Sequence, residues 1–218
     1  MPAGRRKLTW AQIAIMRRGA RKRERFIAAY SFPDYIWKRV RKQVPSADEA
    51  EMLLIEQGLR EWFICCAWRG RAVLGMPSQA VDHAWHEFIL DSLAYTRFCE
   101  QAFGGYLHHT PDEAMTTPMG DALGETVRAW DRSEAARGKE SVLWDLDERL
   151  GLEQPMGLNG LQVAGVRSRA GYTAGAATAC FVGAGGEGGG GESGGGCGGG
   201  GGGGDSGGGG GGCGGGGS

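Results

Sequence analysis

Apolar residues recur every three or four positions along most of the first 150 residues, the spacing that gives an α-helix one buried side. The strongest such stretch begins after Pro45 and ends at Gly70. Its apolar positions are Met52, Ile55, Leu59, Trp62, Phe63 and Cys66. We expect this stretch to form the central buried helix. The same periodicity predicts further helices over 9–18, 22–30, 33–44, 78–90, 91–103 and 121–136, and a last one from 141.

Capping signals mark where several of these helices begin. Thr9 and Ser78 each precede an apolar-periodic stretch, so their side chains can accept a free backbone N–H. Residues 46–49 (Ser-Ala-Asp-Glu) and 110–113 (Thr-Pro-Asp-Glu) both match the capping-box pattern. Alternation typical of strands is absent, as is an internal repeat. The sequence therefore predicts an all-α fold: a compact multi-helix domain.

A glycine-rich segment follows that domain. From residue 183 to 218, 27 of 36 residues are glycine, and no aromatic residue is present. Glycine loses the most backbone entropy on ordering and contributes no apolar side chain to a core. We therefore expect a helical domain over 1–165 and a low-complexity, disordered tail over 166–218.

The net charge of −1 hides a strong asymmetry along the chain. Residues 1–43 carry 13 Lys and Arg against Glu24 and Asp34, a net of +11, whereas the remainder has a net of −12. One interpretation is that this region binds nucleic acid or an anionic surface. The favoured interpretation is a pair of basic helices packed against the acidic remainder. In that case the following apolar residues are buried: Ile13, Met16, Phe26, Ile27, Tyr30, Tyr35, Ile36 and Val40.

The cysteines and the apolar runs indicate a compartment. No run approaches the roughly 20 apolar residues of a transmembrane helix, and the first 18 residues make a poor secretory signal. The six cysteines have irregular spacings that do not indicate a disulfide framework. We expect a cytoplasmic protein with reduced thiols.

All four histidines lie between positions 83 and 109, with Cys99 between the two pairs. At 100° per residue, Asp82 and His86 share one flank of a helix, whereas His83 points elsewhere. Imidazole and thiolate are common ligands of zinc and iron. The sequence therefore offers a candidate metal site for a zinc or iron ion, made of His86, Cys99, His108 and Asp82. The alternative is that Asp82 hydrogen-bonds His86, which orients the loop of His108, while Cys99 is a small buried apolar residue.

The same region resembles a known family. It is similar to the bacterial-type form of the glycine-rich domain-containing protein-like family. The similarity lies in the segment Val81–Leu90 (VDHAWHEFIL) and in the Tyr, Phe-Cys, Phe-Gly and Leu-His-His positions that follow it. The matching positions here are Asp82, Trp85, His86, Tyr95, Cys99, Gly104, His108 and His109. The resemblance implies a helical domain joined to glycine-rich sequence, and it marks these motif residues as the best candidates for a site. It implies no reaction. Some plant members carry an RNA-binding motif, but the aromatic pattern of such motifs is missing here.

The sequence leaves three functions open. The first is a binding or scaffold module that recognises a protein partner. The second is a metal-dependent protein or enzyme that uses the His/Cys/Asp cluster. The third is a precursor whose tail is modified, because Ser193, Cys197, Ser206 and Cys213 sit in polyglycine as in thiazole- and oxazole-bearing microcins. The sequence favours the first.

Overall fold

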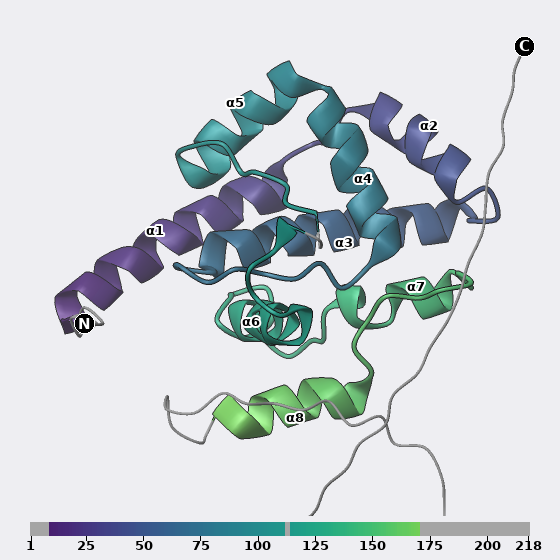
Figure 1. Ribbon diagram of the computed structural model, residues 1–218. Coiled ribbons are helices and arrows are strands. Elements are labelled where there is room, and N and C mark those ends of the chain that lie inside the picture. Colours follow the sequence, from purple (N-terminus) through teal and green to yellow (C-terminus); the bar gives the residue numbers. More distant parts are fainter. Residues whose placement is uncertain (1–8, 112–113, 171–218) are drawn as a thin grey trace, which may run out of the picture. The chain divides into compact units, whose positions relative to one another are not determined.

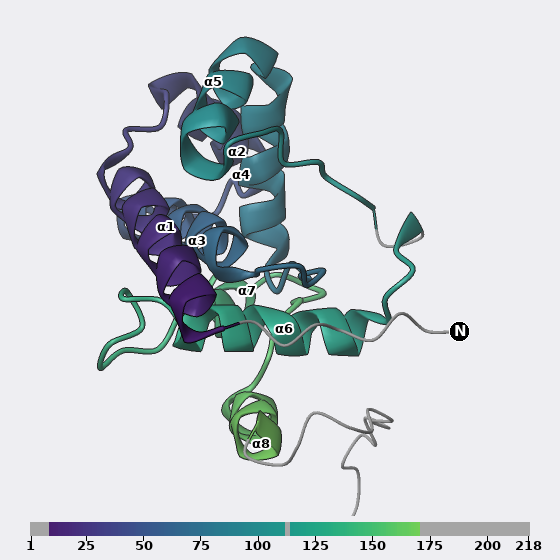
Figure 2. The same cartoon turned by 90° about the vertical axis from the view of Figure 1, so that its left-hand side faces the viewer.

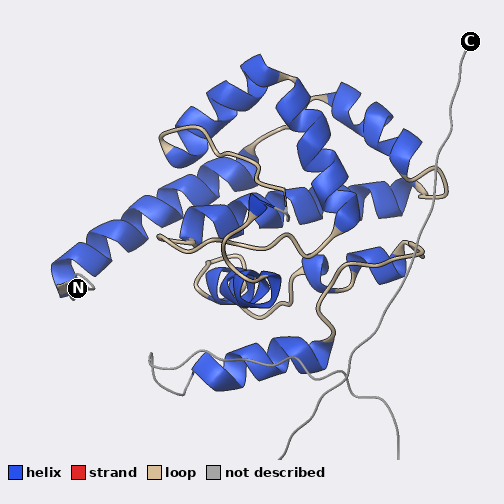
Figure 3. Cartoon of the chain, in the orientation of Figure 1, coloured by secondary structure: helices blue, strands red, loops and turns tan. Residues whose placement is uncertain are grey.

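The computed structural model describes residues 9–111 and 114–170, and all of its regular elements in those ranges are helical (Figures 1 and 3). The predicted all-α class is confirmed. The α-helices are α1 (Trp10–Ala29), α2 (Asp34–Gln43), α3 (Glu49–Trp68), α4 (Gln79–Leu90), α5 (Ser92–Phe103), α6 (Met119–Asp131), α7 (Leu146–Arg149) and α8 (Gly160–Ala170); a 3₁₀ helix, η2 (Val142–Trp144), precedes α7.

Helix α3 is the centre of the domain, as its apolar periodicity predicted. It contacts α1, α4, α6, η2 and α7, and most of its residues are buried, including all six predicted apolar positions. Because neighbours cover it on several sides, α3 is apolar around most of its circumference. Figure 2 shows α1 running alongside α3, with α6 and then α8 stacked beyond them.

Several predicted helix boundaries are confirmed. Thr9 caps α1 in a reciprocal pair with Gln12, and the Ser78 side chain accepts from the backbone N–H of Val81 at the start of α4. Gly104 ends α5 in the left-handed region at φ 78°. The predicted helices 9–18 and 22–30 are instead one continuous helix, α1, which runs through Gly19.

The capping box predicted at Ser46 is wrong by two residues. The chain turns at 44–47, where the Ala47 N–H donates to the Val44 carbonyl. The helix therefore starts later, and Asp48 forms the reciprocal pair with Glu51. The second box, at 110–113, lies partly outside the described residues, because 112 and 113 are not described.

Two residues expected in the core are exposed. Met16 lies in the first half of α1, before the first buried residue of that helix, Ala20. Tyr35 points its hydroxyl toward Asp91, the residue between α4 and α5. Ile27, Ile36 and Val40 are fully buried, as predicted.

The last helix crosses the expected domain boundary. Residues 166–170, expected in the tail, form the end of α8, and Val163 and Val166 of this helix are buried. The rest of the predicted disordered tail, from residue 171, lies outside the described residues. Within the described ranges, none of the helices combines the length and apolarity needed to cross a bilayer.

Three buried carboxylates join segments that are far apart in sequence. Glu24 of α1 accepts hydrogen bonds from the Trp68 indole and from the backbone of 134 and 135. Glu61 of α3 accepts from the side chain of Ser141 and the backbone of residue 142. Asp147 accepts from Ser78 and from the first backbone N–H groups of α4. These bonds offset the cost of burying the carboxylates and fix how the helices meet.

Candidate metal centre

Helix α4 supplies two of the three polar residues of the candidate site. Asp82 lies in its first turn and His86 one turn later, so both side chains emerge on one flank. The start of α4 is rigidly anchored, because Asp147 accepts from the Ser78 hydroxyl at 2.6 Å and from the Gln79 N–H at 2.7 Å. Asp82 lies one helical turn after Ser78, so these hydrogen bonds also fix the position of its backbone.

The third residue, His109, comes from the extended segment that follows α5. Its Nε2 lies 3.0 Å from Oδ1 of Asp82, and Nδ1 of His86 lies 3.2 Å from Oδ2 of the same carboxylate. The two imidazole rings are 4.3 Å apart between centroids. One ligand-type atom from each of Asp82, His86 and His109 lies within 4.8 Å of the other two.

The site is open to solvent on one side. His86 is about half exposed, at 51 %, whereas the side chains of Asp82 and His109 are mostly covered. Nδ1 of His86 also lies 2.8 Å from the backbone carbonyl of Asp82. Nδ1 of His86 therefore lies within reach of both the backbone carbonyl and the side-chain carboxylate of Asp82.

A buried aromatic pair holds the segment that carries His109. The Tyr95 hydroxyl donates to the Leu107 carbonyl at 2.6 Å and accepts from the Trp85 indole N–H at 3.0 Å. The Trp85 ring packs against the His109 ring, 4.6 Å between centroids. Tyr95 is fully buried. The pair therefore ties α4, α5 and the segment of His109 into one unit.

A family model matches residues 22–152, which contain all of these residues. The chain belongs to the UCP032817-like family. No curated protein and no solved structure matches the chain. The description of the UCP032817-like family names no activity.

Two residues of the sequence-predicted ligand set lie outside the cluster of this UCP032817-like domain. Cys99 is fully buried on the inner face of α5, and burial raises the pKa of its thiol above the ordinary value. At neutral pH it is therefore a protonated thiol rather than the thiolate that binds metals. His108 is exposed and packs beside Tyr106, 5.0 Å between ring centroids. The structure thus brings Asp82 and His86 together with His109, the neighbour of the predicted His108.

His83, which the helical geometry separated from this pair, is half buried. Its Nδ1 is buried and has no hydrogen-bond partner among the described residues. It does not belong to the three-residue cluster.

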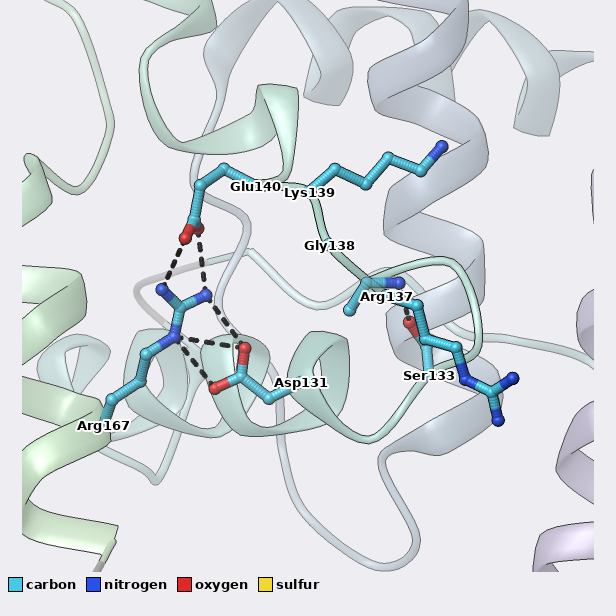
Figure 4. Close-up of a pocket in the computed structure, with 8 residues that line it drawn as sticks. Asp131, Ser133, Arg137, Gly138, Lys139, Glu140 and Arg167 are labelled. Atoms are coloured by element: carbon cyan, nitrogen blue, oxygen red, sulfur yellow. Dashed lines mark hydrogen bonds and ion pairs between the residues drawn. The ribbon is translucent and has the colours of Figure 1, made fainter.

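A second polar cluster, which includes Arg167 beyond the matched residues, has a structural role. Arg167 of α8 makes paired hydrogen bonds to Asp131 at the end of α6 and to Glu140, at 2.7–3.2 Å (Figure 4). Arg167 lines an open pocket of about 490 Å³ together with Arg137 and Lys139, whose side chains point away from Arg167 in Figure 4. The hydrogen bonds from Arg167 lower the pKa of Glu140. The charges of this cluster satisfy one another and fasten α8 to α6.

Proposed function

We propose that this helical module binds one divalent transition-metal ion through Asp82, His86 and His109. The observation that carries the proposal is the convergence of three ligand-type atoms within 4.8 Å of one another. Bonds of about 2.0–2.2 Å to a metal place neighbouring ligand atoms roughly 3.0–3.5 Å apart. The separations of 3.0 and 3.2 Å between the carboxylate and the two imidazoles fit this requirement.

Two imidazoles and one carboxylate suit zinc and ferrous iron. Three protein ligands do not complete the coordination of either ion, and the exposed side of His86 faces solvent. A water molecule or a substrate oxygen could take the remaining positions, as in catalytic rather than closed structural sites. The Trp85–Tyr95 pair would then hold the His109 segment in place, as outer residues do around metal ligands.

Metal content of the full chain, purified without a metal-binding tag, tests the proposal. We expect about one equivalent of zinc or iron, lost in both His86→Ala and His109→Ala. The matched control is His108→Ala, which removes the adjacent, exposed histidine and should retain the metal. Equal loss in His108→Ala and Cys99→Ala would support the ligand set expected from the sequence instead. Full chain without metal, even after zinc is supplied, would reject the proposal.

The binding or scaffold function with a protein partner is a second candidate. It is supported by two exposed leucines at the corner between α4 and α5, Leu90 and Leu93, which are 68 % and 61 % exposed. The free, buried thiols of Cys65, Cys66 and Cys99 support a cytoplasmic location. Membership of the bacterial type of the glycine-rich domain-containing protein-like family also remains a proposal.

Modification of the tail remains a prediction, because Ser193, Cys197, Ser206 and Cys213 lie outside the described residues. The intact mass of the native protein tests it, since each ring formed would remove one water. An unmodified mass would exclude the precursor function.

A further inference from the structure

The solvent face of α1 carries positive charge without any exposed acidic group. The helix contains six basic residues after Met16, and Glu24 is its single carboxylate. Glu24 is buried and accepts hydrogen bonds from the Trp68 indole and from backbone N–H groups of 134 and 135. It therefore does not neutralise the surface. The exposed basic residues are Arg17, Arg18, Arg21, Lys22, Arg23 and Arg25.

Most of these charges are available to a ligand. Arg21 pairs with Glu134. The other five form no ion pair with a carboxylate of the described residues. Arg18, Lys22 and Arg25 follow the i, i+4, i+7 spacing and so form one stripe. This stripe lies opposite the buried positions Ala20 and Ile27, so it faces away from the domain.

The first two turns of the same helix expose apolar side chains. Trp10 is 88 % exposed, Ile15 72 % and Met16 51 %. No residue between Trp10 and Gly19 is buried. In Figure 1 this half of α1 extends past the other helices. At 100° per residue around the helix axis, Trp10 and Ile15 lie on either side of the line of the basic stripe. The outward side of α1 therefore carries apolar residues in its first two turns and basic residues in the turns that follow.

We propose that this outward side of α1 docks on a membrane surface containing anionic phospholipids. The basic stripe complements the lipid phosphates, and the exposed tryptophan and isoleucine enter the boundary between headgroups and acyl chains. Tryptophan is enriched at that boundary because its ring is apolar and its N–H is polar. A nucleic-acid backbone would also attract the arginines, but it offers nothing that buries Trp10 and Ile15. This docking goes beyond the proposed metal site and does not depend on it.

Sedimentation of the full chain with phospholipid vesicles tests the docking. We expect binding to vesicles of phosphatidylcholine with phosphatidylserine and little binding to phosphatidylcholine alone. The triple variant Arg18→Glu/Lys22→Glu/Arg25→Glu should lose binding by at least two orders of magnitude, because each basic residue near an anionic surface contributes about five-fold. Trp10→Ser should weaken binding at unchanged charge, since it removes apolar insertion.

The matched control reverses three exposed basic residues elsewhere, Arg71→Glu/Lys139→Glu/Arg169→Glu. It changes the net charge equally, so it should keep vesicle binding if the stripe is responsible. Circular dichroism of each variant confirms that the helices remain folded.

Three results would overturn the docking. The first is equal binding to neutral and anionic vesicles. The second is equal loss in the control triple variant. The third is binding to duplex or single-stranded RNA or DNA that requires the stripe, with no binding to anionic vesicles, which would assign the stripe to nucleic acid.

Discussion

Tyr95 is the residue whose removal tests most directly how the candidate site is held. Tyr95→Phe deletes one oxygen and changes the size of a fully buried side chain very little. That oxygen takes part in two hydrogen bonds, at 3.0 Å from the Trp85 indole nitrogen and 2.6 Å from the Leu107 carbonyl oxygen. Phenylalanine therefore leaves one buried donor and one buried acceptor without partners.

The expected loss of stability follows from those two groups. An unsatisfied buried polar group costs about 1–3 kcal/mol, and Trp85 and Leu107 are both buried. Some relaxation of the segment after α5 will reduce the sum, so we expect about 2–4 kcal/mol less free energy of unfolding. For a domain of this size, the melting temperature should fall by about 6–15 °C.

The functional consequence is a weaker metal site. Leu107 is two residues before His109, so losing its hydrogen bond frees the segment that presents the third ligand. Loss of an outer-shell partner typically lowers metal affinity by about 10–100-fold. Urea denaturation measures the stability, and competition with a chromophoric chelator measures the zinc affinity. The control is Tyr106→Phe on the same segment; Tyr106 is 43 % exposed and packs on the edge of Tyr95.

Each pattern of results has a distinct meaning. Lower stability with unchanged zinc affinity would refute the idea that Tyr95 positions His109. An effect of similar size in Tyr106→Phe would show that general loosening of the segment is enough. Unchanged stability would mean that the two hydrogen bonds contribute nothing.

Three further substitutions test the packed interior around α3 and α4. Asp147→Ala should cost about 3–5 kcal/mol of unfolding free energy in urea, because Ser78 and the first N–H groups of α4 lose a buried acceptor; a loss below about 1 kcal/mol would contradict this. Gly58→Ala should cost about 1–3 kcal/mol, because a β-carbon there lies 2.6 Å from Cγ2 of Val81; Val81→Ala should relieve the added cost in the double variant, and failure to do so would place the strain elsewhere. Burial raises the pKa of Cys66 from 9.0 to about 12. The contribution of this thiol to stability is therefore fully present below pH 9 and is lost as pH rises from 9 toward 12, by about 1.4 kcal/mol per pH unit. Melting temperatures of Cys66→Ala should depend less on pH in that range than those of the unchanged protein, and an unaltered dependence would contradict the assignment.

Helical periodicity was sufficient to predict the fold class and much of the core. Met52, Ile55 and Leu59 repeat on one side of α3 and are buried there. Such repeats depend only on local geometry, so a sequence reveals them. The beginning of α3 was less predictable, since Ser46 and Asp48 can both cap a helix and the turn at 44–47 decides between them.

The sequence predicted two of the three clustered polar residues. Asp82 and His86 belong to one helix, and their spacing places them on one flank. His109 was among the motif residues, but it lies in an extended segment whose direction helical periodicity does not determine, and its neighbour His108 was named as the ligand. Cys99 was expected either as a metal ligand or as a small buried apolar residue, and its complete burial fits the second expectation.

The buried carboxylates were missed, although a signal was present. Glu24 lies between Ala20 and Ile27 at helical spacing, so it falls on the side of α1 that packs inward. A charge on such a side must find hydrogen-bond donors when it is buried. Its donors come from α3 and from residues 134 and 135, more than 100 positions away for the latter, and a single sequence does not show such distant pairs.

The candidate site and the outward side of α1 should therefore respond independently to mutation. The ligands on α4 are held by Asp147, and the third ligand by Tyr95, so both depend on the packed interior. Trp10 and Arg18 lie on a part of α1 that contributes no buried residue. Sites without shared contacts combine additively. A variant that combines Tyr95→Phe with Trp10→Ser should lose zinc affinity only through the first change and vesicle binding only through the second. If Tyr95→Phe alone also weakened vesicle binding while α1 stayed folded, the two surfaces would be coupled, and the separation of functions argued from their contacts would fail.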